Sequence, residues 1–377
     1  MKRKDRALKI ISFILCLSLT LTAAFVFREG VINAAVKIAF HSAKTFLPQG
    51  ENESVSVAES TVKESAGEEI TESQGSENKT PTEKTSPDSV QTFSGFTSVD
   101  RDIKKLMKQQ QTIKTEKGGD ISEKTYTDEG VTDKFGLVRM KNTNKTKVSL
   151  EKISAEKPKI SVSKNQPTVL IFHTHTTETY QIAERPFYAK DFAPRSESAD
   201  VNMIRVGKAV CEQLEKQGIG VIHDTAIYDG TYSGAYARSR KGAEAYLERY
   251  PSISVVLDIH RDAIQLKNGT KIKPVAEIKG KKAAQIMIIS GCQEEGNGIT
   301  NLPEWRENLK FAVHLQSELE EQFPGITRPL FFCARSYNMN LTKNSLLVEI
   351  GSDANTLDEA VYAGKCLGAA LAELINE

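Results

Sequence analysis

The sequence predicts an α/β domain over residues 166–377, with a mostly parallel twisted sheet and helices on both of its faces. Short, continuously apolar runs alternate here with longer amphipathic segments. This is the pattern of buried parallel strands and of the helices that cover them. A segment of this length buries about 70% of its chain surface and can therefore fold on a core of its own.

The expected elements follow in order along the chain. The first strand is 168–172, and the segment after it, 200–217, has helical periodicity and ends at Gly218. The remaining elements are a strand at 220–223, a helix at 232–250, strands at 254–260 and 285–290, a helix at 303–322, strands at 330–334 and 345–351, and a closing helix at 356–375. Upstream, residues 96–165 are predicted to form a small pre-domain or packing arm, with a helix around 102–111 and short strands within 131–163, one of them at 147–153.

The N-terminus has the charge pattern of a membrane anchor. Residues 1–9 carry five cationic side chains, whereas the 18 residues 10–27 carry no charge. At 1.5 Å per residue a helix of this length reaches about 27 Å, close to the thickness of a hydrocarbon core. We expect a transmembrane helix at 10–27 with residues 1–9 in the cytoplasm. The alternative is a cleaved signal peptide, and either arrangement exports the rest of the chain.

Residues 28–95 are expected to be a juxtamembrane segment followed by a disordered acidic linker. Within 51–90 there are ten acidic residues, three lysines and no aromatic residue. Such a composition buries too little apolar surface to offset chain entropy. Over the whole chain Lys+Arg 50 nearly balances Asp+Glu 49, which argues against nucleic acid as a partner.

Three predicted strand ends carry the residue types of a zinc site. The first strand is followed by His173 and by a His-x-x-Glu motif formed by His175 and Glu178. The strand at 254–260 ends at His260, and the strand at 345–351 contains Glu349. Functional groups of open α/β sheets gather beyond the carboxyl ends of strands. A catalytic zinc takes three His or carboxylate ligands and leaves one position for water.

We therefore predict Zn²⁺ ligands at His175, Glu178 and His260, with His173 and Glu197 as alternates. Glu349 is the candidate general base, because burial in an apolar strand raises a carboxyl pKa toward the working range. Arg261 either stabilises an oxyanion or forms a salt bridge with Asp262. Further along, Asp229, Tyr232 and Tyr236 either line a substrate groove or belong to a helix cap and a solvated face.

Four sequence motifs, taken in their order along the chain, resemble those of one known family. They are HTHTTETY at 173–180, the segment at 218–239, VVLDIHRDA at 255–263, and the segment at 337–360. Together they resemble stage II sporulation protein P of endospore-forming bacteria, over roughly 166–377. The second His motif and the closing segment are also similar to zinc-dependent N-acetylmuramoyl-L-alanine amidases, whose fold is zinc carboxypeptidase-like. That likeness aligns His175 with a ligand and keeps Glu197 as an alternate.

The resemblance implies a membrane-anchored peptidoglycan hydrolase that acts in engulfment during sporulation. It would cut the amide between N-acetylmuramic acid and L-alanine, and it could also cut peptide cross-links. The same resemblance implies single-pass localisation at the sporulation septum or the engulfing membrane, with the catalytic domain outside, and partnership with stage II sporulation proteins D and M. Two other functions stay open: a zinc endopeptidase or carboxypeptidase acting on stem peptides, and a non-catalytic membrane-anchored scaffold.

Overall fold

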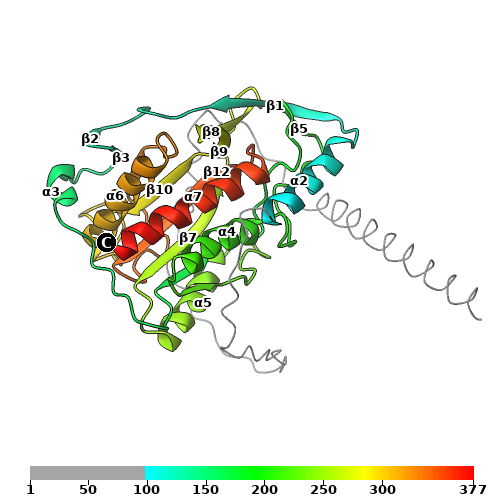
Figure 1. The fold of residues 1–377 in the computed structure, drawn as a ribbon. Helices are drawn as coiled ribbons and strands as arrows, with labels where there is room; N and C mark the ends of the chain where they lie inside the picture. Colours follow the sequence, from blue (N-terminus) through cyan, green and yellow to red (C-terminus); the bar gives the residue numbers. More distant parts are fainter. Residues whose placement is uncertain (1–97) are drawn as a thin grey trace, which may run out of the picture.

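The computed structural model describes residues 98–377, and their main feature is an eight-stranded sheet (Figure 1). Its strands, in spatial order, are β2 (Asp133–Phe135), β3 (Val138–Asn142), β11 (Leu330–Cys333), β10 (Ile286–Gly291), β12 (Asn344–Ser352), β7 (Val255–Asp262), β4 (Val169–Phe172) and β6 (Val221–His223). In this sheet only the β2/β3 and β10/β12 pairs are antiparallel, and the other five pairs are parallel. The fold is a mixed α/β fold.

Helices cover the two faces of this sheet unequally. The helices are α2 (Ser98–Gln111), α3 (Leu150–Ser154), α4 (Met203–Lys216), α5 (Ala235–Arg249), α6 (Trp305–Gln322) and α7 (Leu357–Asn376). Helices α4, α6 and α7 lie together across one face (Figure 1), where their apolar side chains form one core with the alternate residues of β4, β7, β10 and β12. Helix α5 packs on the other face, against Leu170, Phe172 and Val256 of β4 and β7.

A second sheet is present that the sequence pattern did not predict. It has four strands in the order β5 (Phe187–Ala189), β1 (Lys117–Lys124), β8 (Lys271–Ile278) and β9 (Lys281–Ala284). Residues 98–165 therefore contribute β1 to this sheet and β2 and β3 to the main one. The buried amine of Lys273 helps to hold β1 in place, since it lies 2.8 Å from the Glu123 carboxylate and 3.0 Å from that of Glu359.

The strand predicted at 147–153 is wrong, because this segment contains helix α3. The Ser149 side chain accepts from the Lys152 amide and caps the helix. Leu150 is buried, and Ile153, three residues later, packs against the same core. The local capping signal outweighed the apparent alternation of apolar residues.

The predicted transmembrane helix at 10–27 and the predicted linker at 28–95 lie outside the described residues. Within residues 98–377, no helix is both long enough and apolar enough to cross a bilayer.

Helices α4 and α7 cross at close range because glycines remove the side chains between them. A Cβ atom at Gly368 would lie 2.5 Å from the Val210 carbonyl oxygen and 2.8 Å from the Gln213 Cβ. At Gly364, a Cβ would lie 3.0 Å from the Val206 carbonyl oxygen. This contact fixes the position of α4, whose first residue, Met203, donates its backbone amide to the carbonyl of Thr176 in the turn that carries the predicted metal ligands.

Gly368→Ala is expected to destabilise the protein by about 1–3 kcal/mol, since overpacking against backbone atoms outweighs the gain of about 1 kcal/mol in helix propensity. The matched control is Gly230→Ala, because a Cβ there meets nothing within 4 Å, and its free energy of unfolding should change by about 0.5 kcal/mol or less. Urea denaturation of the full-length variants measures both effects. Equal stability of Gly368→Ala and the wild type would contradict the close helix contact.

Candidate metal centre

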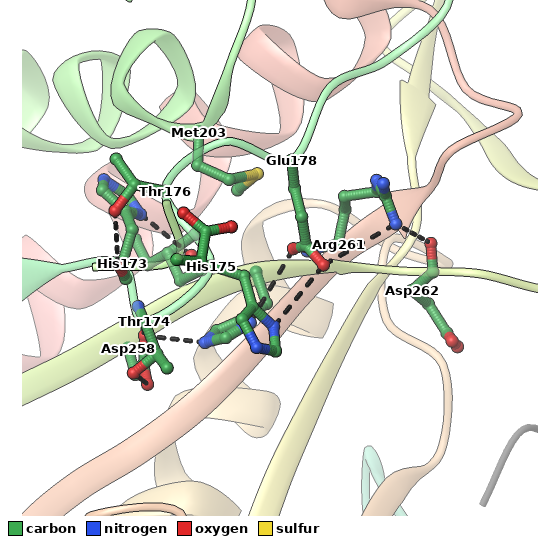
Figure 2. Close-up of polar contacts among 12 residues, drawn as sticks. His173, Thr174, His175, Thr176, Glu178, Met203, Asp258, Arg261 and Asp262 are labelled. Carbon is green, nitrogen blue, oxygen red and sulfur yellow. Dashed lines mark hydrogen bonds and ion pairs between the residues drawn. The ribbon is translucent and has the colours of Figure 1, made fainter. Parts of the chain in front are cut away.

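The turn that follows β4 carries the first two predicted ligands. Within residues 173–178 the chain turns back, so that the Glu178 amide donates to the His175 carbonyl at 3.1 Å. Asp229 holds this turn, because its carboxylate accepts from the Thr177 amide at 3.1 Å and from the Thr177 hydroxyl at 2.7 Å. As a result, Glu178 Oε1 and His175 Nδ1 lie 3.6 Å apart and point toward each other (Figure 2).

Strands β7 and β12 supply the other groups from one face of the main sheet. Asp258 and His260 are two residues apart in β7, so their side chains emerge on the same face. Glu349 of β12 is the direct register partner of His260 in the parallel β7/β12 pair. The pairing shifts immediately after Glu349, where Gly351 adopts a φ of 64° that favours glycine.

The three predicted ligands come together in space. One ligand atom each from His175, Glu178 and His260 lies within 4.8 Å of the other two. His260 Nδ1 is 3.8 Å from Glu178 Oε2, and the two imidazole rings meet edge to face with their centroids 5.0 Å apart. Glu178 and His260 are only 5% and 3% exposed, so the cluster is largely shielded from water.

The Asp258 carboxylate lies in close contact with the second ring nitrogen of His260. Its Oδ1 lies 2.7 Å from His260 Nε2, which leaves Nδ1 directed toward Glu178. The Asp258 carboxylate is itself held by Thr174, whose amide and hydroxyl donate to it at 2.8 and 2.7 Å. A carboxylate behind a His ring in this manner orients the ring as a metal ligand and raises its basicity.

The electrostatics of the cluster favour a cation. Burial alone would lower the pKa of His260, but the Asp258 carboxylate, with Glu178 and Glu349, raises that pKa to about 9. The pKa of His175 is lowered to about 3, first by burial and then by the charge of His260, so its imidazole is neutral at physiological pH. A neutral imidazole beside converging carboxylates is the donor set that zinc prefers.

His173, the alternate ligand, lies outside this cluster. Its Nδ1 is 2.8 Å from the Ile259 carbonyl and its Nε2 is 2.9 Å from His223 Nε2, so both ring nitrogens are engaged. A Cβ at Gly207 of α4 would lie 2.5 Å from the Nε2 atoms of both rings. The pair therefore packs beneath α4. The other alternate, Glu197, is exposed and is also outside the cluster.

Arg261 lies beside the cluster with its guanidinium already engaged. Its Nε donates to the Thr179 carbonyl at 3.0 Å, its Nη2 donates to the Pro194 carbonyl at 2.8 Å, and its Nη1 is 3.7 Å from Glu178 Oε1. The salt bridge to Asp262 considered from the sequence does not form. The contact of Arg261 with Asp262 is with the backbone carbonyl of that residue (Figure 2). The Asp262 carboxylate instead pairs with Arg328 at 2.8 Å.

Glu349 has an unusual environment for a carboxyl group. Its Oε2 is shielded from solvent and has no hydrogen-bond partner within residues 98–377. Burial raises the pKa of Glu349 to about 8, and the nearby Asp262 carboxylate adds to this rise. A buried carboxyl with an unpaired oxygen is costly for the fold, and such groups are concentrated at functional sites.

Aromatic residues Tyr232 and Tyr236 flank the cluster, and both interpretations of their segment, a substrate groove or a helix cap with a solvated face, stay predictions. The Tyr232 ring stacks on His175 at 5.0 Å, and the Tyr236 ring stacks parallel to His260 at 6.3 Å. Arg195 covers Tyr232 at 5.2 Å and lies 3.6 Å from Glu178 Oε1.

Sequence reasoning missed Asp258 and Arg195. For Asp258 a signal existed: a charged residue inside an apolar strand, two positions before His260 and so on the same face. For Arg195 the sequence contained no such signal, because Arg195 lies in a loop whose path depends on tertiary contacts.

Solved structures provide distant similarities. An N-acetylmuramoyl-L-alanine amidase from Clostridium difficile 630 is 19% identical, and the match covers 56% of this chain and 96% of that one with a TM-score of 0.31. The CwlD amidase from Clostridioides difficile, solved in complex with the GerS lipoprotein, is 12% identical, with coverages of 55% and 96% and a TM-score of 0.34.

Sequence comparison is more specific. Stage II sporulation protein P of Bacillus subtilis strain 168 is 28% identical over 222 residues, which are 56% of this chain and 51% of that relative. The chain thus spans about half the length of that relative. Residues 50–372 also match the family described as stage II sporulation protein P. Because this match covers most of the sequence, the chain belongs to the stage II sporulation protein P family.

Proposed function

We propose that the protein is a zinc-dependent peptidoglycan hydrolase that cuts the amide between N-acetylmuramic acid and L-alanine. The observation that carries the proposal is the convergence of His175, Glu178 and His260 beside a buried carboxyl, Glu349, that has no hydrogen-bond partner. Membership of the stage II sporulation protein P family supports a role in the cell wall during sporulation.

His175, Glu178 and His260 would hold the zinc ion. The fit rests on two imidazoles and one carboxylate whose ligand atoms lie within 4.8 Å of one another, and on Asp258 behind the His260 ring. A bound zinc ion polarises an amide carbonyl and lowers the pKa of water toward about 7.

Glu349 is the general base and then the general acid in this proposal. It accepts a proton from the attacking water and returns it to the leaving amine. Its place beside His260, on the neighbouring strand, puts it next to the ligand set without making it a member. Burial raises the pKa of Glu349 to about 8, close to physiological pH, so this carboxyl can both release and accept a proton there.

Arg261 acts as a positioning residue in this mechanism and not as an oxyanion donor. In support, its guanidinium is bound to the carbonyls of Thr179 and Pro194, and its backbone amide donates to Glu178 Oε2 at 3.3 Å. These contacts set the orientation of the Glu178 carboxylate. A zinc ion held by these ligands, or another donor, would then supply the oxyanion stabilisation.

We also propose that residues 10–27 anchor the protein as a single-pass membrane helix. Residues 1–9 would lie in the cytoplasm, and the hydrolase would lie outside, at the sporulation septum or the engulfing membrane. The support is the uncharged 18-residue run behind a cationic N-terminus. Resemblance to the family suggests stage II sporulation proteins D and M as partners.

The metal assignment is tested with a histidine pair. His260→Ala should lose the zinc that the wild-type protein carries, about one ion per chain, because two remaining ligands rarely retain zinc against a chelator. His314→Ala is the control: this ring lies on α6 and contacts the Glu156 carbonyl at 3.0 Å, so its zinc content should stay unchanged. Atomic absorption after dialysis measures both, and full occupancy in His260→Ala would remove that residue from the ligand set.

The base assignment is tested with a glutamate pair. Glu349→Gln should retain zinc and fold but lose a factor of about 10²–10⁴ in the rate of stem-peptide release, since the amide cannot accept the proton. Glu197→Gln, which alters an exposed carboxyl outside the cluster, should keep its activity. Mass spectrometry of digested peptidoglycan gives the rate and identifies the bond that is cut. Retention of more than about a tenth of the activity by Glu349→Gln would contradict the role.

If the digest instead contains opened cross-links with stem peptides still attached to muramic acid, the protein is an endopeptidase. If the wild-type protein releases no fragments while it binds zinc, the scaffold alternative holds.

A further inference from the structure

The face of the main sheet that carries Glu349 continues past it, over strands that α5 does not cover. Met287 of β10 is the register partner of Glu349, and Phe331 of β11 is the register partner of Lys141 of β3. Only Met287 is a direct neighbour of Glu349, because Phe331 and Lys141 lie in the next row of the sheet, beyond the buried Ile289. Met287, Phe331 and Lys141 nevertheless point to the same face as Glu349, and all three are half-buried. Together with Arg335, just after β11, they form what we call the open strip: Met287, Phe331, Lys141 and Arg335.

The open strip carries two cations, Lys141 and Arg335, that form no ion pair with an acidic residue in the described part of the chain. The Lys141 amine lies over the Phe331 ring, 5.4 Å from its centroid, and Arg335 Nη1 donates to the Ala334 carbonyl at 3.1 Å. Within residues 98–377, neither cation has a carboxylate within ion-pair distance. On the His175 side of the cluster, by contrast, Arg195 is paired with Asp229 and lies near Glu178.

A strained loop brings the Arg335 end of the strip toward the metal centre. Tyr337 and Asn338 both have positive φ angles, 39° and 58°, which residues other than glycine rarely adopt. Asn338 holds this conformation, because its side-chain amide donates to the Tyr236 carbonyl at 3.0 Å. The Tyr337 ring then stacks on Tyr236 at 5.4 Å, and Tyr236 stacks on His260.

We propose that the open strip binds the peptide part of the substrate through its carboxylates. This inference rests on the proposed function, and it assigns the direction in which the substrate lies across the site. The peptide runs from Glu349 over β10 and β11 toward β3, and Arg335 and Lys141 pair with successive carboxylates along it. Charge complementarity selects this occupant, since unpaired cations beside apolar Met287 and Phe331 suit an acidic peptide.

The dimensions agree with a short peptide. Neighbouring strands are about 4.8 Å apart, so β3 lies about 14 Å from β12 across the sheet. An extended peptide of four or five residues spans about 13–18 Å at 3.3–3.6 Å per residue. A stem of this length therefore reaches from the scissile bond at Glu349 to the amine of Lys141.

Binding of soluble muramyl peptides to the full-length protein tests the proposal without hydrolysis. All measurements use the Glu349→Gln background, with two ligands: one with free carboxylates and one with the same carboxylates converted to amides. Arg335→Gln and Lys141→Gln should each weaken binding of the free-carboxylate ligand by about tenfold or more, which is typical of a lost charge-assisted hydrogen bond. Neither should weaken binding of the amidated ligand by more than about twofold.

Two control variants complete the experiment. Lys164→Gln removes an exposed lysine ahead of β4, at the end of the sheet away from the site, and should leave both dissociation constants unchanged. Arg335→Lys keeps the charge and should recover part of the affinity for the free-carboxylate ligand.

The proposal is overturned if the parent protein binds both ligands equally well, because the carboxylates then contribute nothing. It is also overturned if Arg335→Gln weakens both ligands equally, which would indicate loss of structure or contacts with the glycan. Failure of the proposed function is a separate result: Glu349→Gln would then hydrolyse peptidoglycan as fast as the wild type, while the binding data would still decide the role of the strip.

Discussion

The parallel pairing of β7 with β12 is the constraint on which the candidate site depends. It places Glu349 directly beside His260 on one face of the sheet. Because side chains alternate along a strand, a slip of one residue would turn Glu349 into the core formed with α4, α6 and α7. The register then shifts at Gly351 and resumes at Ser352, which pairs with Asp262, and a Cβ at this glycine would lie 2.5 Å from Asn355 Oδ1. Register at one strand pair therefore decides whether ligands and base meet.

Hydrogen bonds from neighbouring residues fix the geometry of the cluster, whereas the buried Glu349 carboxyl lowers the stability of the fold. Thr174 fixes Asp258, Asp229 fixes the turn before Glu178, and Arg261 is bound to two carbonyls beside it. Each of these polar groups forms hydrogen bonds within the protein. Glu349 differs from these groups, because it is a buried carboxyl whose Oε2 has no hydrogen-bond partner among the described residues, and this difference supports its proposed role in the chemistry.

The sequence was sufficient to predict the main sheet and the members of the cluster, because each depends on a local rule. Apolar runs indicate buried strands, and the carboxyl ends of parallel strands meet at one edge, so His175, Glu178 and His260 were expected together. The choice between His173 and His175 could not be made in this way, because the chain leaves the strand at that point and alternation no longer applies. The second sheet was missed since β1 and β8 are distant in sequence and their pairing has no local signal. The same holds for Arg195, which a loop brings to Glu178.

X-ray absorption at the zinc edge, measured on the full-length protein, tests the central claim most directly. We expect one zinc ion bound by two imidazole nitrogens and one carboxylate of the protein. The spectrum of Glu349→Gln should show the same protein ligands. Loss of a carboxylate ligand in Glu349→Gln, or a spectrum unchanged by His260→Ala, would contradict it.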